Sequence, residues 1–119
     1  MILVVEDDPQ VARLIALILQ RRGEKVDVVA DGRAALERAK TSRPAMILAD
    51  LTIKGMDGET LCSSLKQFEE TRSIPYVILS GDRDIAQKAR HCGADDYLGK
   101  PFEFDDLLRL VDKYAGIES

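Results

Sequence analysis

Five short apolar runs recur along the chain, and an amphipathic stretch follows each of them. The runs cover residues 2–5, 26–30, 46–49, 76–79 and, more weakly, 95–98. Short continuous apolar runs are typical of strands covered on both faces, as in a parallel sheet. Parallel neighbours require crossover connections, which are helical and right-handed in nearly all sheets. The pattern therefore predicts an α/β fold, a doubly wound (βα)5 sandwich around a five-stranded parallel sheet.

The segments between the runs have the spacing of amphipathic helices. In the first, Val11, Ile15 and Ile18 fall on one face. Asp8 stands just before Pro9, which predicts an N-cap there, and a helix cap is the more ordinary role for this carboxylate than metal binding. The other predicted helices are Arg33–Lys40, Gly58–Phe68 with Asp57 as its cap, Asp84–Cys92 and Glu103–Tyr114.

Composition excludes several classes of protein. A length of 119 residues predicts one domain, residues 1–119, and the net charge of -4 argues against direct nucleic-acid binding. No apolar run approaches the ~18 residues that span a bilayer, so we expect a cytoplasmic protein with no membrane contact. Cys62 and Cys92 are isolated, which disfavours a zinc site or a disulfide framework and suggests packing residues.

Polar side chains follow four of the five predicted strands. Glu6 and Asp7 follow the first, Asp50 the third, Ser80 the fourth and Lys100 the fifth. Ligands of open α/β sheets bind at this edge, beyond the carboxyl ends of the strands. Clustered carboxylates repel each other unless a cation lies among them, and oxygen ligands suit Mg²⁺. With the ion and the lysine present, such an edge could hold a phosphoryl group.

Each of these residues also has an ordinary interpretation. Adjacent acids at a strand end can be a solvated turn, Ser80 can cap a helix, and Lys100 can be a surface lysine. Their shared position at one edge of the sheet is what favours a site. His91 is interpreted as a helix-surface residue without a catalytic role.

Several motifs in fixed order carry a family resemblance. They are Ile2-Leu3-Val4-Val5-Glu6-Asp7-Asp8-Pro9, Asp50, Met56-Asp57-Gly58, Ser80, Gly93-Ala94-Asp95-Asp96-Tyr97 and Lys100-Pro101-Phe102. Together they resemble the receiver domain of two-component response regulators over nearly the whole chain. The resemblance implies a flavodoxin-like sheet with strand order 2-1-3-4-5. It also implies that Asp50 accepts a phosphoryl group from a phosphohistidine, on a histidine kinase or a histidine phosphotransferase.

The same resemblance implies roles for the other residues. Glu6, Asp7, Asp50 and the backbone carbonyl of Thr52 would bind Mg²⁺, and Ser80 and Lys100 would contact the phosphoryl group. Tyr97 would be the aromatic switch residue, and a cis peptide bond would join Lys100 to Pro101. Phosphorylation would reshape the face of the fourth helix, fifth strand and fifth helix, and so control a downstream protein or an attached output domain. Such a domain is no enzyme, although it slowly hydrolyses its own aspartyl phosphate.

The sequence departs from the family pattern in places. Lys54 stands where proline is frequent, so we expect a more mobile or differently shaped loop after Asp50. Leu110 and Ala86 stand where DNA-binding receivers have the basic residues of a dimer interface, which disfavours that dimer. Thr52 and Asp82 occupy positions that influence phosphoryl lifetime in this family. The five units fill the chain, so we expect a single-domain regulator or a receiver excised from a larger protein.

Three other functions are weighed against this one. A dehalogenase-like phosphatase needs a second Asp two residues after its nucleophile, where Thr52 stands. A flavodoxin-like cofactor binder needs a Ser/Thr/Gly-rich loop after the first strand, where the sequence is acidic. A pseudo-receiver that signals by binding alone would lack Asp50, Lys100 or the acidic pair, and all are present.

Overall fold

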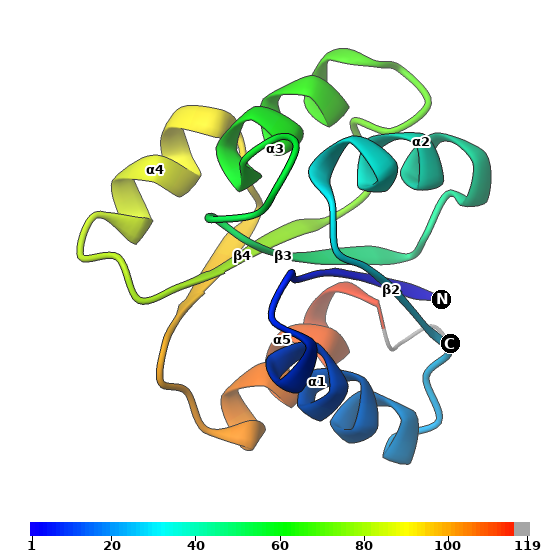
Figure 1. Ribbon diagram of the computed structural model, residues 1–119, viewed down its shortest axis with the longest axis vertical. Coiled ribbons are helices and arrows are strands. Elements are labelled where there is room, and N and C mark those ends of the chain that lie inside the picture. Colours follow the sequence, from blue (N-terminus) through cyan, green and yellow to red (C-terminus); the bar gives the residue numbers. More distant parts are fainter. Residues whose placement is uncertain (116–119) are drawn as a thin grey trace.

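The computed structural model describes residues 1–115, in which five strands alternate with five helices (Figure 1). The elements are β1 (Ile2–Val5), α1 (Pro9–Arg21), β2 (Val26–Val29), α2 (Gly32–Ser42), β3 (Met46–Asp50), α3 (Gly58–Gln67), β4 (Tyr76–Ser80), α4 (Ile85–Cys92), β5 (Asp96–Gly99) and α5 (Phe104–Tyr114). All strand pairs are parallel, and the order is β2-β1-β3-β4-β5. The predicted doubly wound fold and strand order are confirmed.

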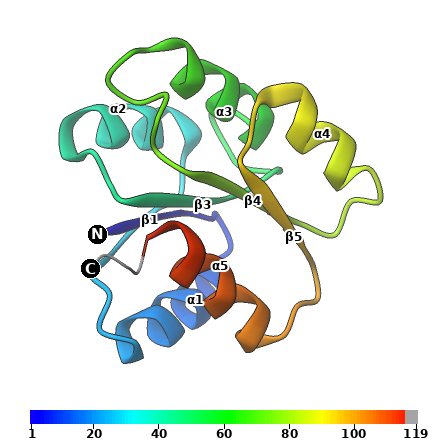
Figure 2. The same cartoon turned by 180° about the vertical axis from the view of Figure 1, so that it is seen from behind.

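The sheet separates two helical layers. Helices α1 and α5 cover one face, and α2, α3 and α4 cover the other (Figures 1 and 2). Alternate residues of a strand point to opposite faces, so Leu3 and Val5 join the core under α2–α4, while Ile2 and Val4 join the core under α1 and α5. Every residue of β1 is buried as a result. This double coverage explains why the central strands have continuous apolar runs.

The two edge strands differ from the central ones. Burial alternates along β5 between half-buried and exposed residues, and in β2 only Val29 is buried. An edge strand has a neighbour on one side only, so fewer of its side chains are enclosed. This exposure explains why the fifth apolar run is the weakest in the sequence.

Three strands reach further than their apolar runs predict. β3 ends at Asp50, β4 at Ser80 and β5 at Gly99. Strand pairing is made by the backbone and continues through polar residues, with Asp50 opposite Leu79 and Ser80 opposite Gly99. The site residues Asp50 and Ser80 therefore lie on the rigid sheet itself.

The helix starts are set by short polar caps. The predicted caps are confirmed, since Asp8 Oδ1 accepts from the backbone N of Gln10 at 3.0 Å and Asp57 Oδ1 from that of Thr60 at 2.8 Å. α2 begins one residue earlier than predicted, because Asp31 caps it in the same way. Among the helices of residues 1–115, none combines the length and apolar character needed to cross a bilayer.

Candidate functional site

Lys100 lies between two carboxylates at the carboxyl edge of the sheet. Its Nζ donates to Asp50 Oδ2 at 3.0 Å and to Glu6 Oε1 at 3.3 Å. The three residues follow or end β5, β3 and β1, and the strand order brings them together from positions far apart in the sequence. The Glu6 side chain is 3% exposed and that of Asp50 16%. The Lys100–Pro101 peptide bond is cis.

The charges in this cluster are unequal. Burial raises the pKa of Glu6, and the Asp8 backbone N–H and the Lys100 charge only partly oppose this effect. Burial alone would lower the pKa of Lys100, but the hydrogen bond to Asp50 and the charges of both carboxylates outweigh it and leave that pKa raised. One ammonium therefore faces two carboxylates, and the half-buried Asp7 follows Glu6 in the chain. The edge can accept a further positive charge.

The donor set fits a hard divalent cation. Within residues 1–115, no three His, Cys, Asp or Glu side chains stand close enough together to hold a metal ion by themselves. Mg²⁺ does not need such a cage, because it keeps several waters and binds through one or two carboxylates. Glu6, Asp7 and Asp50 are all oxygen donors at this edge, and the carbonyl of Thr52 lies in the loop that follows. The chemistry of the edge therefore suits Mg²⁺.

Ser80 and Thr52 flank Asp50. Ser80 is buried, and its Oγ accepts from the backbone N of Asp82 at 3.0 Å. The backbone N of Thr52 donates to Asp50 Oδ1 at 3.4 Å, so the two oxygens of this carboxylate have different partners. The Asp82 carboxylate accepts from Lys88 Nζ at 2.6 Å, which directs it toward α4.

Backbone hydrogen bonds hold the loop that follows Asp50 at two points. The backbone N of Gly32 donates to Lys54 O at 2.7 Å, and Asp31 and Lys54 form an isolated parallel bridge. At the end of the loop, the backbone N of Gly58 donates to Leu51 O at 2.8 Å. The unusual Lys54 thus pairs with the start of α2, which gives this loop a defined shape.

Other residues singled out in the sequence lie away from this cluster. Tyr97 is 42% exposed on the edge strand β5. His91 is exposed in the last turn of α4, as predicted. Cys62 and Cys92 are free, buried residues of the core under α2–α4.

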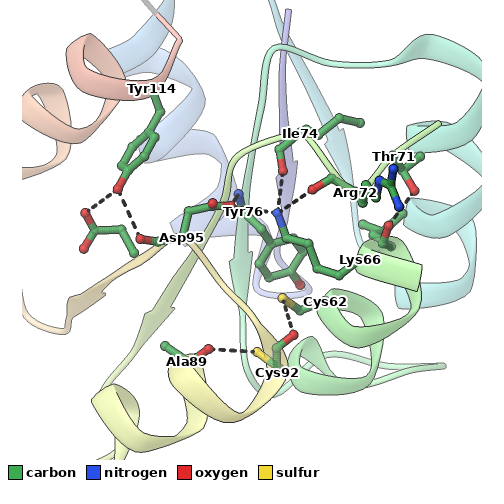
Figure 3. A network of polar contacts seen from close by, with 12 residues as sticks. Cys62, Lys66, Thr71, Arg72, Ile74, Tyr76, Ala89, Cys92, Asp95 and Tyr114 are labelled. Atoms are coloured by element: carbon green, nitrogen blue, oxygen red, sulfur yellow. Dashed lines mark hydrogen bonds and ion pairs between the residues drawn. The ribbon is translucent and has the colours of Figure 1, made fainter. Parts of the chain in front are cut away.

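A second polar network was not predicted from the sequence. It lies at the amino edge of the sheet, where Lys66 Nζ donates to Asp95 Oδ2 at 2.8 Å (Figure 3). The same carboxylate oxygen accepts from the backbone N of Tyr76 at 2.8 Å. These residues come from α3, β4 and the turn before β5, and no sequence pattern groups them, although Asp95 belongs to the motif of residues 93–97. Only their proximity in the folded structure identifies them as one group.

Known proteins share both the sequence pattern and this architecture. The family model described as the response regulator receiver domain matches residues 2–112. The chain belongs to this receiver domain family. Its fold is shared with a response regulator from Chloroflexus aurantiacus, which is 34% identical, with a TM-score of 0.91 over 95% of this receiver and 94% of that chain.

Two further relatives are a longer regulator and the receiver domain of a sensor histidine kinase. The DNA-binding dual master transcriptional regulator RpaA of Synechocystis is 35% identical over 112 residues, covering 92% of this receiver and 46% of RpaA. The receiver thus spans about half the length of the curated relatives it matches. The receiver domain of the sensor histidine kinase PA1611 from Pseudomonas aeruginosa is 30% identical, with a TM-score of 0.90 over 98% and 97% of the two chains. That structure has a magnesium ion coordinated in its active site cleft.

Proposed function

We propose that residues 1–119 form a single receiver domain in which Asp50 accepts a phosphoryl group from the phosphohistidine of a histidine kinase or a histidine phosphotransferase. The observation that carries this proposal is the position of Lys100, whose Nζ contacts Asp50 Oδ2 at 3.0 Å and Glu6 Oε1 at 3.3 Å. A lysine held beside one carboxylate oxygen is placed to meet a phosphoryl oxygen once that carboxylate is phosphorylated.

The chemistry needs a nucleophile and charge neutralisation. An oxygen of the ionised Asp50 forms the new bond to phosphorus while the P–N bond breaks. The electron pair of that bond stays on the imidazole nitrogen, which takes up a proton. Lys100 neutralises charge on a phosphoryl oxygen, and the Ser80 hydroxyl donates a hydrogen bond to another. No general base is required, because a carboxylate is already nucleophilic.

Glu6, Asp7, Asp50 and the Thr52 carbonyl would hold Mg²⁺. The ion neutralises negative charge on the phosphoryl oxygens when it is bound. The unequal charges of the cluster and the magnesium ion in the related PA1611 receiver support this assignment. Without a cation, the carboxylates at this edge would repel an incoming phosphoryl group.

The aspartyl phosphate acts as a signal. Phosphorylation adds charge and acceptor oxygens at Asp50, toward which Ser80 moves, and Tyr97 leaves its exposed position for the vacated space. The α4–β5–α5 face then changes shape for a downstream protein or an attached output domain, as a shift between two populations.

Water slowly attacks phosphorus, breaks the O–P bond and restores the carboxylate. We place this exchange in the cytoplasm and propose no direct contact of the domain itself with membrane or nucleic acid.

Intact mass spectrometry tests the proposal. The wild type is incubated with phosphoramidate or acetyl phosphate, with and without Mg²⁺, beside Asp50→Asn and the matched control Asp57→Asn. We expect a gain of one phosphoryl group that requires Mg²⁺, is lost in Asp50→Asn and persists in Asp57→Asn, whose carboxylate only caps α3. No gain in the wild type, together with no response to beryllofluoride, would overturn the proposal in favour of a pseudo-receiver.

A further inference from the structure

Tyr76 is a buried tyrosine whose hydroxyl reaches the start of α3. It begins β4, is 1% exposed, and belongs to the core under α2–α4. Its OH donates to the backbone carbonyl of Gly58 at 2.9 Å. Burial raises the pKa of this hydroxyl well above its usual value, so it stays a neutral donor. A buried hydroxyl aimed at one carbonyl fixes the position of that carbonyl.

Gly58 in turn touches the backbone of Asp50. A Cβ placed on Gly58 would lie 2.3 Å from Asp50 O and 2.9 Å from Leu51 Cα, closer than side chains are found. The backbone N of Gly58 donates to Leu51 O at 2.8 Å. The first residue of α3 therefore packs directly against Asp50 and closes the loop of residues 51–57. A shift of Gly58 would therefore press on the backbone of Asp50 and Leu51.

The other end of Tyr76 is also anchored. Its backbone N donates to Asp95 Oδ2, which also accepts from Lys66 Nζ, and Figure 3 shows the tyrosine between this ion pair and the helices that carry Cys62 and Cys92. Lys66 belongs to the last turn of α3, so one tyrosine links both ends of that helix to β4. With its backbone fixed, the aromatic ring acts as a rigid spacer between the amino edge of the sheet and Gly58.

We propose that Tyr76 is a positioning residue for phosphorylation, whose hydroxyl holds Gly58 and the loop of residues 51–57 in place against Asp50. The inference rests on the proposed role of Asp50 as phosphoacceptor. Phosphoryl transfer depends on placement of the nucleophile and its cation ligands, and misplacement by an ångström costs about 100-fold in rate. Loss of one hydroxyl leaves the loop looser rather than displaced, so the expected effect is smaller.

The test compares two variants that each remove one tyrosine hydroxyl. Tyr76→Phe frees the Gly58 carbonyl, whereas Tyr114→Phe removes a hydroxyl that donates to Asp95 O at 3.1 Å and Asp96 Oδ2 at 2.9 Å, on the α5 side. With phosphoramidate, we expect the phosphorylation rate of Tyr76→Phe to fall about threefold to tenfold. We also expect the Mg²⁺ concentration for half-maximal rate to rise, and neither value to change in Tyr114→Phe.

A purely structural role for Tyr76 would give a different result. Urea unfolding of Tyr76→Phe would then show lower stability, while its rate and Mg²⁺ dependence at 25 °C, where the variant is folded, would equal those of the wild type. That outcome overturns the inference and leaves the proposed function intact, whereas a wild type that is never phosphorylated overturns the proposed function.

A measurement on the wild type makes the test independent of the variant's folding. The buried Tyr76 hydroxyl proton is followed by NMR, together with the amide signals of residues 51–58. We expect a nuclear Overhauser contact from this proton to the start of α3, and a shift of its signal when beryllofluoride and Mg²⁺ are added. An unmoved hydroxyl signal beside shifted loop amides would contradict the inference.

Discussion

Two half-buried lysines lie at opposite edges of the same sheet, and their surroundings differ in charge balance. Lys66, at the amino edge, donates to the carbonyls of Arg72 at 3.1 Å and Ile74 at 3.0 Å and to Asp95 at 2.8 Å. Lys100, at the carboxyl edge, instead lies between the carboxylates of Glu6 and Asp50. The three partners of Lys66 carry one negative charge in total. The two partners of Lys100 carry two.

This difference in charge balance distinguishes a structural network around Lys66 from a candidate binding site around Lys100. At Lys66 each ammonium proton has an acceptor and the charges cancel, so the network is complete without a ligand. At Lys100 the negative charge of the two carboxylates exceeds the positive charge of one ammonium, which is the imbalance that the proposed Mg²⁺ ion would offset. Residue type alone does not distinguish the two edges, since both are built from lysine and carboxylates. The ratio of negative to positive charges around each lysine distinguishes them.

The largest effect is expected on phosphorylation when Lys100 is removed. Lys100→Met deletes the cation beside Asp50, and we expect phosphorylation by phosphoramidate to slow by about 100-fold or more. The measurement is the rate of mass gain with saturating Mg²⁺. Lys113→Met is the matched control, because Lys113 is 64% exposed and 3.7 Å from Asp96 Oδ2. A Lys100→Met rate within threefold of the wild type would remove the distinction between the two edges.

Removal of Lys66 should instead affect stability. Lys66→Met leaves two carbonyls and the Asp95 carboxylate short of a donor, and we expect the free energy of unfolding to fall by about 2 kcal/mol. Urea unfolding followed by circular dichroism measures it, against less than about 0.5 kcal/mol for Lys113→Met. Phosphorylation of the folded variant should stay near the wild-type rate. A loss of phosphorylation comparable to that of Lys100→Met would show that the edges are not separable.

Mg²⁺ should stabilise the folded protein by binding at the carboxyl edge of the sheet. At a Mg²⁺ concentration ten times its dissociation constant, we expect the wild type to gain about 1.4 kcal/mol in free energy of unfolding. Asp7→Asn should lose most of this gain because one of the oxygen ligands loses its charge. Urea unfolding with and without Mg²⁺ provides the comparison, and an equal gain in both proteins would place the bound ion elsewhere.

The smallest effect concerns Tyr76 at alkaline pH. The pKa of Tyr76 is raised in the folded chain from its ordinary value of 10.0. The folded chain therefore keeps a proton that the unfolded chain has lost, so the free energy of unfolding falls as pH rises through 10. At pH 10.5 we expect the wild type to have lost about 0.8 kcal/mol more than Tyr76→Phe, each relative to pH 8. Parallel pH profiles of the two proteins would contradict the assigned burial.

The fold could be predicted because central strands are covered on both faces. That coverage requires continuous apolar runs, and the runs give the strands and their helical crossovers. The strand ends were less predictable, since Asp50 and Ser80 extend β3 and β4 through backbone pairing that side-chain polarity does not reveal. The edge strand β5 has the weakest apolar run because half of its residues are exposed.

The two edges differ in how far the sequence predicts them. Glu6, Asp50 and Lys100 could be grouped in advance, because each follows or ends a strand and parallel strands end at one edge. Lys66, Tyr76 and Asp95 could not, since their contacts depend on how α3 packs against β4. The same holds for Lys54, whose carbonyl pairs with the start of α2.

The identity of the phosphorylated residue is the most direct test of the account. The wild type is phosphorylated with phosphoramidate and Mg²⁺, reduced with borohydride to convert an acyl phosphate to homoserine, and mapped by peptide mass spectrometry. We predict homoserine at position 50 alone, and none when Mg²⁺ is omitted. Homoserine at position 7 or 57, or at no position, would contradict the claim that the charge-unbalanced edge around Lys100 is the phosphoacceptor site.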